Sequence, residues 1–121
     1  MRLFNIESSP RTDGGFKLSL SGELDLSTVE QLEREVATKV DGRGGLVVLD
    51  LRELGFLDSA GLRIMLRLQE RVTGHGGRLV LVRGPRRVHR VFELTGAEEE
   101  LLIVADPSEV GDTQDLSAGK G

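Results

Sequence analysis

The sequence predicts a small α/β domain with a mixed, mostly parallel β-sheet and helices packed on it. Three observations support this fold class. The chain has 121 residues and a mass of 13.2 kDa, which is typical of one domain, and its 38% of hydrophobic residues suffice for a modest core. Short apolar runs alternate with amphipathic segments, and a turn signal separates the first two runs. The resulting order is β-β-α-β-α-β-α-β, which implies parallel strands joined by right-handed crossovers after an N-terminal hairpin.

The N-terminal part is expected to form a β-hairpin followed by a helix. Leu3–Glu7 is typical of a strand, and Phe16–Ser21 alternates apolar and polar residues as a half-buried strand does. The two glycines after Asp13 indicate the turn between these strands. Ser27 has capping-box spacing to Glu30 and should begin the helix. Four residues fall on one face of that helix and should point inward: Val29, Leu32, Val36 and Val40.

The rest of the chain alternates strands and helices. The predicted strands are Leu46–Leu51, Leu79–Val82 and Leu101–Ala105. One helix should run from Ser59 to Thr73, and another should begin at Pro85 and stop at Gly96, with Val88, Val91 and Phe92 inward. Because the chain has no Trp or Tyr, three phenylalanines are expected to anchor the core: Phe16, Phe56 and Phe92.

We expect residues 1–105 to form the folded domain and residues 106–121 to form an acidic, glycine-rich tail. The tail should be largely disordered and should contribute nothing to the core. The absence of cysteine suits a reducing compartment, and the N-terminal stretch lacks a long apolar segment. These features predict a soluble cytoplasmic protein without a membrane span.

The charge distribution argues against a nucleic-acid partner. The net charge is −4, and the tail holds four acids and one lysine, which leaves 15 bases and 16 acids in residues 1–105. The arginines are scattered along the sequence, and aromatic residues make up only 3% of the chain. Without a basic face or a stacking platform, we expect no direct contact with nucleic acid.

Asp58 and Ser59 stand side by side where an apolar strand turns into a helix. An esterase-type serine would occupy such a turn, but the glycine expected two residues before it is missing. The candidate bases, His75 and His89, have ordinary explanations as a loop residue and a helix-surface residue. We therefore expect no catalytic residue and no enzymatic activity. Helix capping by either side chain is the simpler explanation, although one cap residue would suffice and two polar groups are present.

Cofactor and metal sites are not indicated by the sequence. The glycine runs Gly42–Gly45 and Gly74–Gly77 follow predicted helices, whereas phosphate-binding loops precede them. Metal binding has only scattered carboxylates to draw on. We expect neither a cofactor nor a bound metal.

Three motifs, spaced in order along the chain, point to a known family. The segment Asp50–Leu62, DLRELGFLDSAGL, has a strand ending in DL that leads to F-x-D-S-x-G-L and a helix. Ser21–Asp25 reads SGELD, and Pro85–Gly96 carries a proline, spaced valines and a closing Thr-Gly. Together they resemble the STAS domains of bacterial anti-sigma factor antagonists, also called anti-anti-sigma factors. The resemblance covers residues 3–105 and implies a STAS-like layer domain.

The resemblance also implies a function and a modified residue. In antagonists of this type, the serine directly after the motif's aspartate is phosphorylated by an anti-sigma factor that is also a serine kinase. That role falls on Ser59, and Ala60 stands where relatives often carry a second hydroxyl. The unphosphorylated protein would bind the kinase and release a sigma factor, and a phosphatase would act on phospho-Ser59. The alternatives are a STAS scaffold or accessory subunit of another regulatory or transport complex, and a nucleotide- or ligand-binding sensor.

The family match implies a partner surface around the same loop. Its residues would be Asp25, Asp58, Ser59, Ala60, Gly61, Arg63, Ile64 and Arg67. Arg63 and Arg67 lie on the polar face of the helix, where they either face solvent or meet acidic groups of the partner. Ile64 is either a partly exposed contact or part of the core, and Asp25 is either a plain loop residue or a partner contact.

Overall fold

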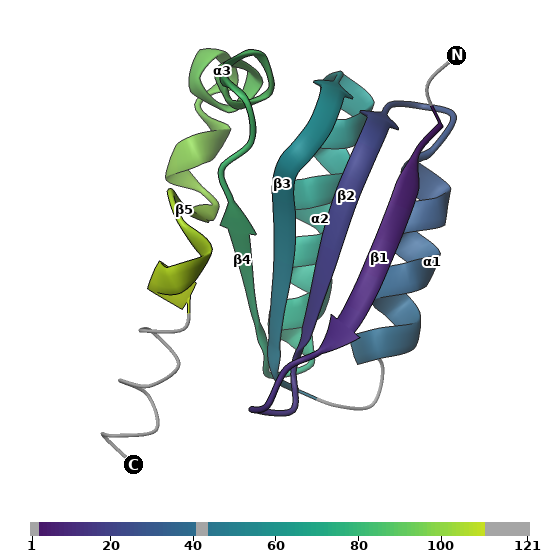
Figure 1. Ribbon diagram of the computed structural model, residues 1–121, viewed down its shortest axis with the longest axis vertical. Helices are drawn as coiled ribbons and strands as arrows, with labels where there is room; N and C mark the ends of the chain where they lie inside the picture. Colours follow the sequence, from purple (N-terminus) through teal and green to yellow (C-terminus); the bar gives the residue numbers. More distant parts are fainter. Residues whose placement is uncertain (1–2, 41–43, 111–121) are drawn as a thin grey trace.

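The computed structural model describes residues 3–40 and 44–110, which build one five-stranded β-sheet with helices packed against it (Figure 1). The strands are β1 (Asn5–Pro10), β2 (Phe16–Leu24), β3 (Leu46–Leu57), β4 (Arg78–Val82) and β5 (Leu102–Val104). The helices are α1 (Val29–Val40), α2 (Ser59–Gly74) and α3 (Arg86–Thr95), and a 3₁₀ turn, η1 (Ala97–Glu99), precedes β5. The predicted order of elements and the predicted fold class are confirmed.

The strands lie in the sheet in chain order, β1-β2-β3-β4-β5. β1 and β2 are antiparallel, as expected of a hairpin, whereas every later pair is parallel and is joined through a helix. Side chains from the helices and from one face of the sheet form the main core. Its strand residues include Leu18, Leu20, Val47, Leu49, Leu79 and Leu81, and its helix residues include Leu32, Val36, Leu62, Met65, Leu68 and Phe92.

β3 is longer than the sequence predicted, because it continues beyond Leu51 to Leu57. Its register with β2 shifts twice, between Ser19 and Ser21 and between Gly22 and Glu23. Each shift places one extra residue in β3. The core positions in this half of the strand are Leu51, Leu54 and Leu57. Their spacing of three, instead of the usual two, concealed the second half of the strand in the sequence.

The start of α1 differs from the predicted capping box. Ser27 donates from its backbone N and its Oγ to Oδ1 of Asp25, at 3.0 and 2.7 Å, and so does not act as the helix cap. Thr28 Oγ1 instead accepts from the backbone N of Asp25 at 2.9 Å, and the N–H of Val29 donates to the Asp25 carbonyl at 3.0 Å. The predicted inward positions Leu32, Val36 and Val40 are buried.

The expectation about aromatic anchors needs correction. Phe92 is buried and Phe16 is half-buried, but Phe56 is 43% exposed. The second register shift in β3 turns Leu57 into the core, so the preceding Phe56 points outward. Phe4, which the sequence analysis did not single out, is buried in the core instead.

His89 is also placed differently from the prediction of a helix-surface residue. Only 6% of the residue is exposed, because the buried face of α3 contains Val88, His89 and Phe92. α3 ends as predicted at Gly96, whose φ of 79° is the left-handed conformation common at helix C-termini.

A smaller cluster of valines lies on the other face of the sheet. Val48 and Val80 alternate with core residues along β3 and β4, and they pack with Val82 and Val110. Residues 107–110 form a helical turn, and Val110 is only 2% exposed. The expectation that residues 106–121 contribute nothing to the core is therefore wrong for Val110. Residues 111–121 of the predicted tail lie outside the described residues.

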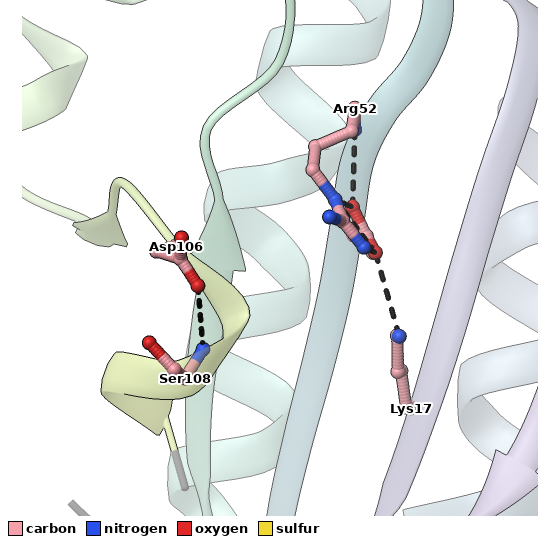
Figure 2. Close-up of polar contacts among 5 residues, drawn as sticks. Lys17, Arg52, Asp106 and Ser108 are labelled. Atoms are coloured by element: carbon pink, nitrogen blue, oxygen red, sulfur yellow. Dashed lines mark hydrogen bonds and ion pairs between the residues drawn. The ribbon is translucent and has the colours of Figure 1, made fainter. Parts of the chain in front are cut away.

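A buried carboxylate on β3, Asp50, lies beside this cluster. Arg52 donates to it from Nε at 3.0 Å and from Nη2 at 2.7 Å, and Lys17 Nζ lies 3.6 Å from it. Burial alone would raise the pKa of Asp50, but the hydrogen bonds and the positive charges of Arg52 and Lys17 lower it below its usual value. Figure 2 shows Lys17 and Arg52 with Asp106, which accepts a hydrogen bond from the Ser108 N–H at 2.9 Å.

Within residues 3–40 and 44–110, none of the helices combines the length and the apolar character that crossing a membrane requires.

Candidate functional site

The ends of β2 and β3 bring the predicted site residues together. Leu24 pairs with Leu57 at the last position of the parallel β2–β3 ladder, and Asp25 and Asp58 directly follow these two residues. The N–H of Asp58 donates to the Leu24 carbonyl at 3.4 Å, which ties the two chain segments together beyond the ladder. Two aspartates from distant parts of the sequence therefore leave the same edge of the sheet side by side.

Asp58 caps α2. Its backbone is extended, with φ −107° and ψ −173°, and its Oδ1 accepts a hydrogen bond from the Gly61 N–H at 2.9 Å. Its carbonyl accepts from the Leu62 N–H at 3.0 Å, the first hydrogen bond of the helix. The question left by the sequence, which of two adjacent polar residues caps the helix, is thus answered in favour of Asp58.

Ser59 is the first residue of α2 and is exposed. Within the described part of the chain, its hydroxyl takes part in none of the hydrogen bonds around the helix start. Because Asp58 satisfies the capping requirement, the Ser59 hydroxyl is available to a partner. Ala60 beside it is half-buried and offers no competing hydroxyl.

Gly61 is required by the close approach of α2 to the end of β2. A Cβ atom at this position would lie 2.6 Å from the Leu24 carbonyl oxygen and 2.5 Å from Cδ1 of Leu57. Both distances are far below a normal contact of about 3.5 Å. Glycine at residue 61 therefore fixes the position of the helix start and, with it, the position of Ser59.

The Asp25 loop is held by its own hydrogen bonds. Two of them come from Ser27 to the Asp25 carboxylate, and they lower the pKa of Asp25 below its usual value, with Thr28 adding to the effect. Asp25 is therefore ionised at neutral pH and has a fixed orientation. Its carboxylate is a stable negative charge at the edge that also carries Ser59.

Two exposed apolar side chains at this edge were not recognised in the sequence. Leu26, next to Asp25, is 77% exposed, and Phe56 pairs with Glu23 in the β2–β3 ladder near the end of the sheet. An exposed apolar residue is not unusual by itself, but these two lie close to the polar site and could contribute contact area to an interface. The sequence analysis assigned no role to Leu26, which follows the SGELD motif, and it expected Phe56 in the core as an aromatic anchor.

Comparison with known proteins identifies the family. The family model described as "Mlab, STAS domain" matches residues 8–104. The chain belongs to the STAS domain family. It is 32% identical over 108 residues to the anti-sigma-B factor antagonist of Staphylococcus aureus, a match that spans 88% of this chain and 96% of that protein. It is 38% identical over 86 residues to BtrV of Bordetella bronchiseptica, spanning 71% of this chain and 74% of BtrV.

A solved structure agrees with the fold of this STAS domain. The crystal structure of an anti-sigma factor antagonist from Mycobacterium paratuberculosis superposes with a TM-score of 0.82 at 23% identity, covering 92% of this chain and 93% of that one. The family and the fold expected from the three sequence motifs are confirmed.

The residues predicted for the partner surface of the STAS domain divide into exposed and buried ones. Asp25, Asp58, Ser59 and Ala60 gather at the sheet edge, and Arg63 is exposed on the next turn of α2. Gly61 is buried, so it acts through the position of the backbone. Ile64 is only 2% exposed and belongs to the core, which excludes the alternative of a surface contact.

Arg67 is exposed, but it has a partner within the STAS domain. Its Nη2 lies 3.0 Å from Oε2 of Glu33 on α1, so the arginine bridges α1 and α2. Arg63 forms no ion pair with another residue of the described chain. Of the two arginines, Arg63 is the one whose charge is available to a partner.

Proposed function

We propose that this STAS domain protein is an anti-sigma factor antagonist that is switched by phosphorylation of Ser59. In the unphosphorylated form it binds an anti-sigma factor with serine kinase activity and so releases a sigma factor. Phosphorylation ends this binding, and a phosphatase restores it. These reactions require ATP and the transcription machinery, which places the protein in the cytoplasm. The names of its relatives support the general function, and the site supports the choice of Ser59.

The observation that carries the proposal is that Asp58 and Ser59 have different roles at the start of α2. Asp58 holds the helix start through the Gly61 N–H, and Ser59 presents an exposed hydroxyl that the fold does not use. A kinase can therefore transfer the γ-phosphoryl group of ATP to Ser59 Oγ, with loss of the hydroxyl proton and release of ADP, without breaking a contact of the fold.

Phosphorylation changes the charge at the site more than it changes the fold. A phosphoserine carries about −1.5 to −2 charges at neutral pH. The N-terminal end of α2 favours a negative charge through the helix dipole. Binding of the partner, in contrast, becomes less favourable. The phosphate lies at the same edge as the carboxylates of Asp25 and Asp58, and a partner adapted to the neutral hydroxyl has to desolvate all three negative groups.

The partner surface consists of this edge and its exposed neighbours. Leu26 and Phe56 supply apolar contact area, Asp25 supplies a fixed negative charge, and Arg63 supplies a positive one. Apolar anchors with a polar rim are the usual composition of a specific protein interface. The proposed partner accordingly has a basic group opposite Asp25 and an apolar pocket for Leu26.

Phosphorylation by candidate anti-sigma kinases, measured by intact mass, tests the proposal. We expect a single phosphate on the natural protein, none on Ser59→Ala, and one on the control Ser9→Ala, which removes another exposed hydroxyl, on β1. Equal phosphorylation of Ser59→Ala and Ser9→Ala would contradict the choice of Ser59. If no kinase modifies the natural protein, the alternative of a STAS accessory subunit of another complex is favoured.

A further inference from the structure

His89 occupies an unusual environment on the far side of the domain from the α1–α2 contact. Its side chain is only 8% exposed and stacks on Phe92, with ring centroids 6.0 Å apart. Neither ring nitrogen has a hydrogen-bond partner among the described residues. Buried polar atoms are normally paired, so an unpaired imidazole in the interior calls for a ligand.

Two carboxylates face this imidazole from different elements. Oε2 of Glu98 on η1 lies 3.5 Å from His89 Nε2, and Oε2 of Glu93, one helical turn further along α3, lies 3.9 Å from it. The three atoms all lie within 4.8 Å of one another. Both carboxylates are exposed enough to exchange water for another ligand.

Two of the three separations fit an ion held between these atoms. Ligand atoms each about 2.1 Å from a tetrahedral zinc ion lie about 3.4 Å apart. The distances of 3.5 and 3.9 Å from the imidazole nitrogen to the two carboxylates are close to that spacing. A direct hydrogen bond would require a shorter and better aligned approach.

We propose that His89, Glu93 and Glu98 form a binding site for a divalent transition-metal ion, with Zn²⁺ as the best candidate. One imidazole with two carboxylates is a ligand set used for zinc, whereas Mg²⁺ and Ca²⁺ prefer oxygen ligands alone. The two carboxylates balance the charge of the ion. Bound zinc would tie α3 to η1, immediately before β5 enters the sheet.

The residues around the site determine how tightly it should bind zinc and which fourth ligand the metal should take. A cavity of about 300 Å³ adjoins His89 and Glu93 and is bordered by Arg83, Arg86 and Arg90. Three positive charges weaken the attraction for a cation, so we expect zinc to bind less tightly than at a site without them. The same charges favour an anion as the fourth ligand of the metal.

Zinc titration of the full chain by calorimetry, after dialysis against a chelator, tests the site. We expect one Zn²⁺ per chain, no comparable binding of Mg²⁺, and a rise in melting temperature on adding zinc. Glu98→Gln should weaken binding at least about tenfold, since even residues that only support a ligand cost that much. Glu99→Gln, which makes the same charge change at the neighbouring exposed residue of η1, should bind as the natural protein does.

The same titration distinguishes the alternatives. If Glu98→Gln and Glu99→Gln bind zinc equally, the ion is attracted by general negative charge and the assigned site is wrong. If the natural protein shows no saturable zinc binding, the proposal fails. Glu93→Gln removes another proposed ligand and should also weaken zinc binding. His75→Ala, which removes the other histidine, should leave the affinity unchanged.

Discussion

Replacement of Gly61 by alanine tests the geometry that positions Ser59. The new Cβ would meet the Leu24 carbonyl oxygen at 2.6 Å, and this oxygen cannot easily retreat because it accepts a hydrogen bond from the Asp58 N–H. Overpacking of this kind costs about 1–3 kcal/mol, whereas alanine is favoured over glycine in a helix by about 0.5–1 kcal/mol. The net expectation is a loss of up to about 2.5 kcal/mol.

The same substitution at the other end of the helix provides the control. Gly74 is the last residue of α2, and a Cβ there would have no atom within 4 Å. Gly74→Ala should therefore raise stability by up to about 1 kcal/mol. Urea unfolding followed by circular dichroism measures both variants, and Gly61→Ala should unfold at a lower urea concentration than the natural protein. If both substitutions stabilise the protein alike, α2 does not approach the end of β2 as closely as described.

Three further substitutions probe separate parts of the domain. Ser59→Asp should keep the melting temperature but lose binding to the anti-sigma kinase in calorimetry; a large drop in melting temperature would show that the added charge acts on the fold instead. Leu26→Ser should weaken the same complex at least about tenfold with unfolding unchanged, because its side chain is 77% exposed, and unaltered affinity would remove Leu26 from the partner surface. Asp50→Asn should cost about 1 kcal/mol at neutral pH by removing the charge-assisted hydrogen bond from Arg52, whose half-exposed side chain remains hydrated. Since the pKa of Asp50 is lowered in the folded state, its contribution is present above the unfolded value near 3.9 and is lost as pH falls through the folded value. Acid unfolding of Asp50→Asn should therefore be less steep, and an unchanged profile would contradict this assignment.

Much of the fold followed from periodicity and turn chemistry. The hairpin, the three helices of the βα units and the parallel pairing were predictable because apolar residues repeat at the strand and helix periods. The second half of β3 was not predictable in this way, because two register shifts place its buried residues Leu51, Leu54 and Leu57 at intervals of three. Val110 was missed for a different reason. A single valine in a polar segment has no periodicity, and only its packing against Val48 and Val80 reveals it.

The site was predictable where the motif specified residues and less so where packing decided the outcome. The sequence placed Asp25 and Asp58 near each other only through the family resemblance, and the β2–β3 register supplies the physical reason. Helical spacing did not settle whether Ile64 faces the core, and it does. His89 was expected on the surface of its helix, but α3 buries it beside Phe92.

The switch proposed for Ser59 depends on the surroundings of the phosphate, which is exposed to water in the free protein but shielded from water in the complex. In the free protein, repulsion between a dianion and a carboxylate about 6 Å away amounts to about 1 kcal/mol in water. The N-terminal end of α2 offsets much of this with about 0.3–1 kcal/mol of favourable dipole interaction. In a complex that excludes water, the same repulsion grows to several kcal/mol, and each 1.4 kcal/mol changes affinity tenfold. Asp25 and Asp58 are held in place by Ser27 and Gly61, so they cannot turn away from the new charge. Phosphorylation of Ser59 is therefore expected to be nearly neutral for folding but strongly unfavourable for docking.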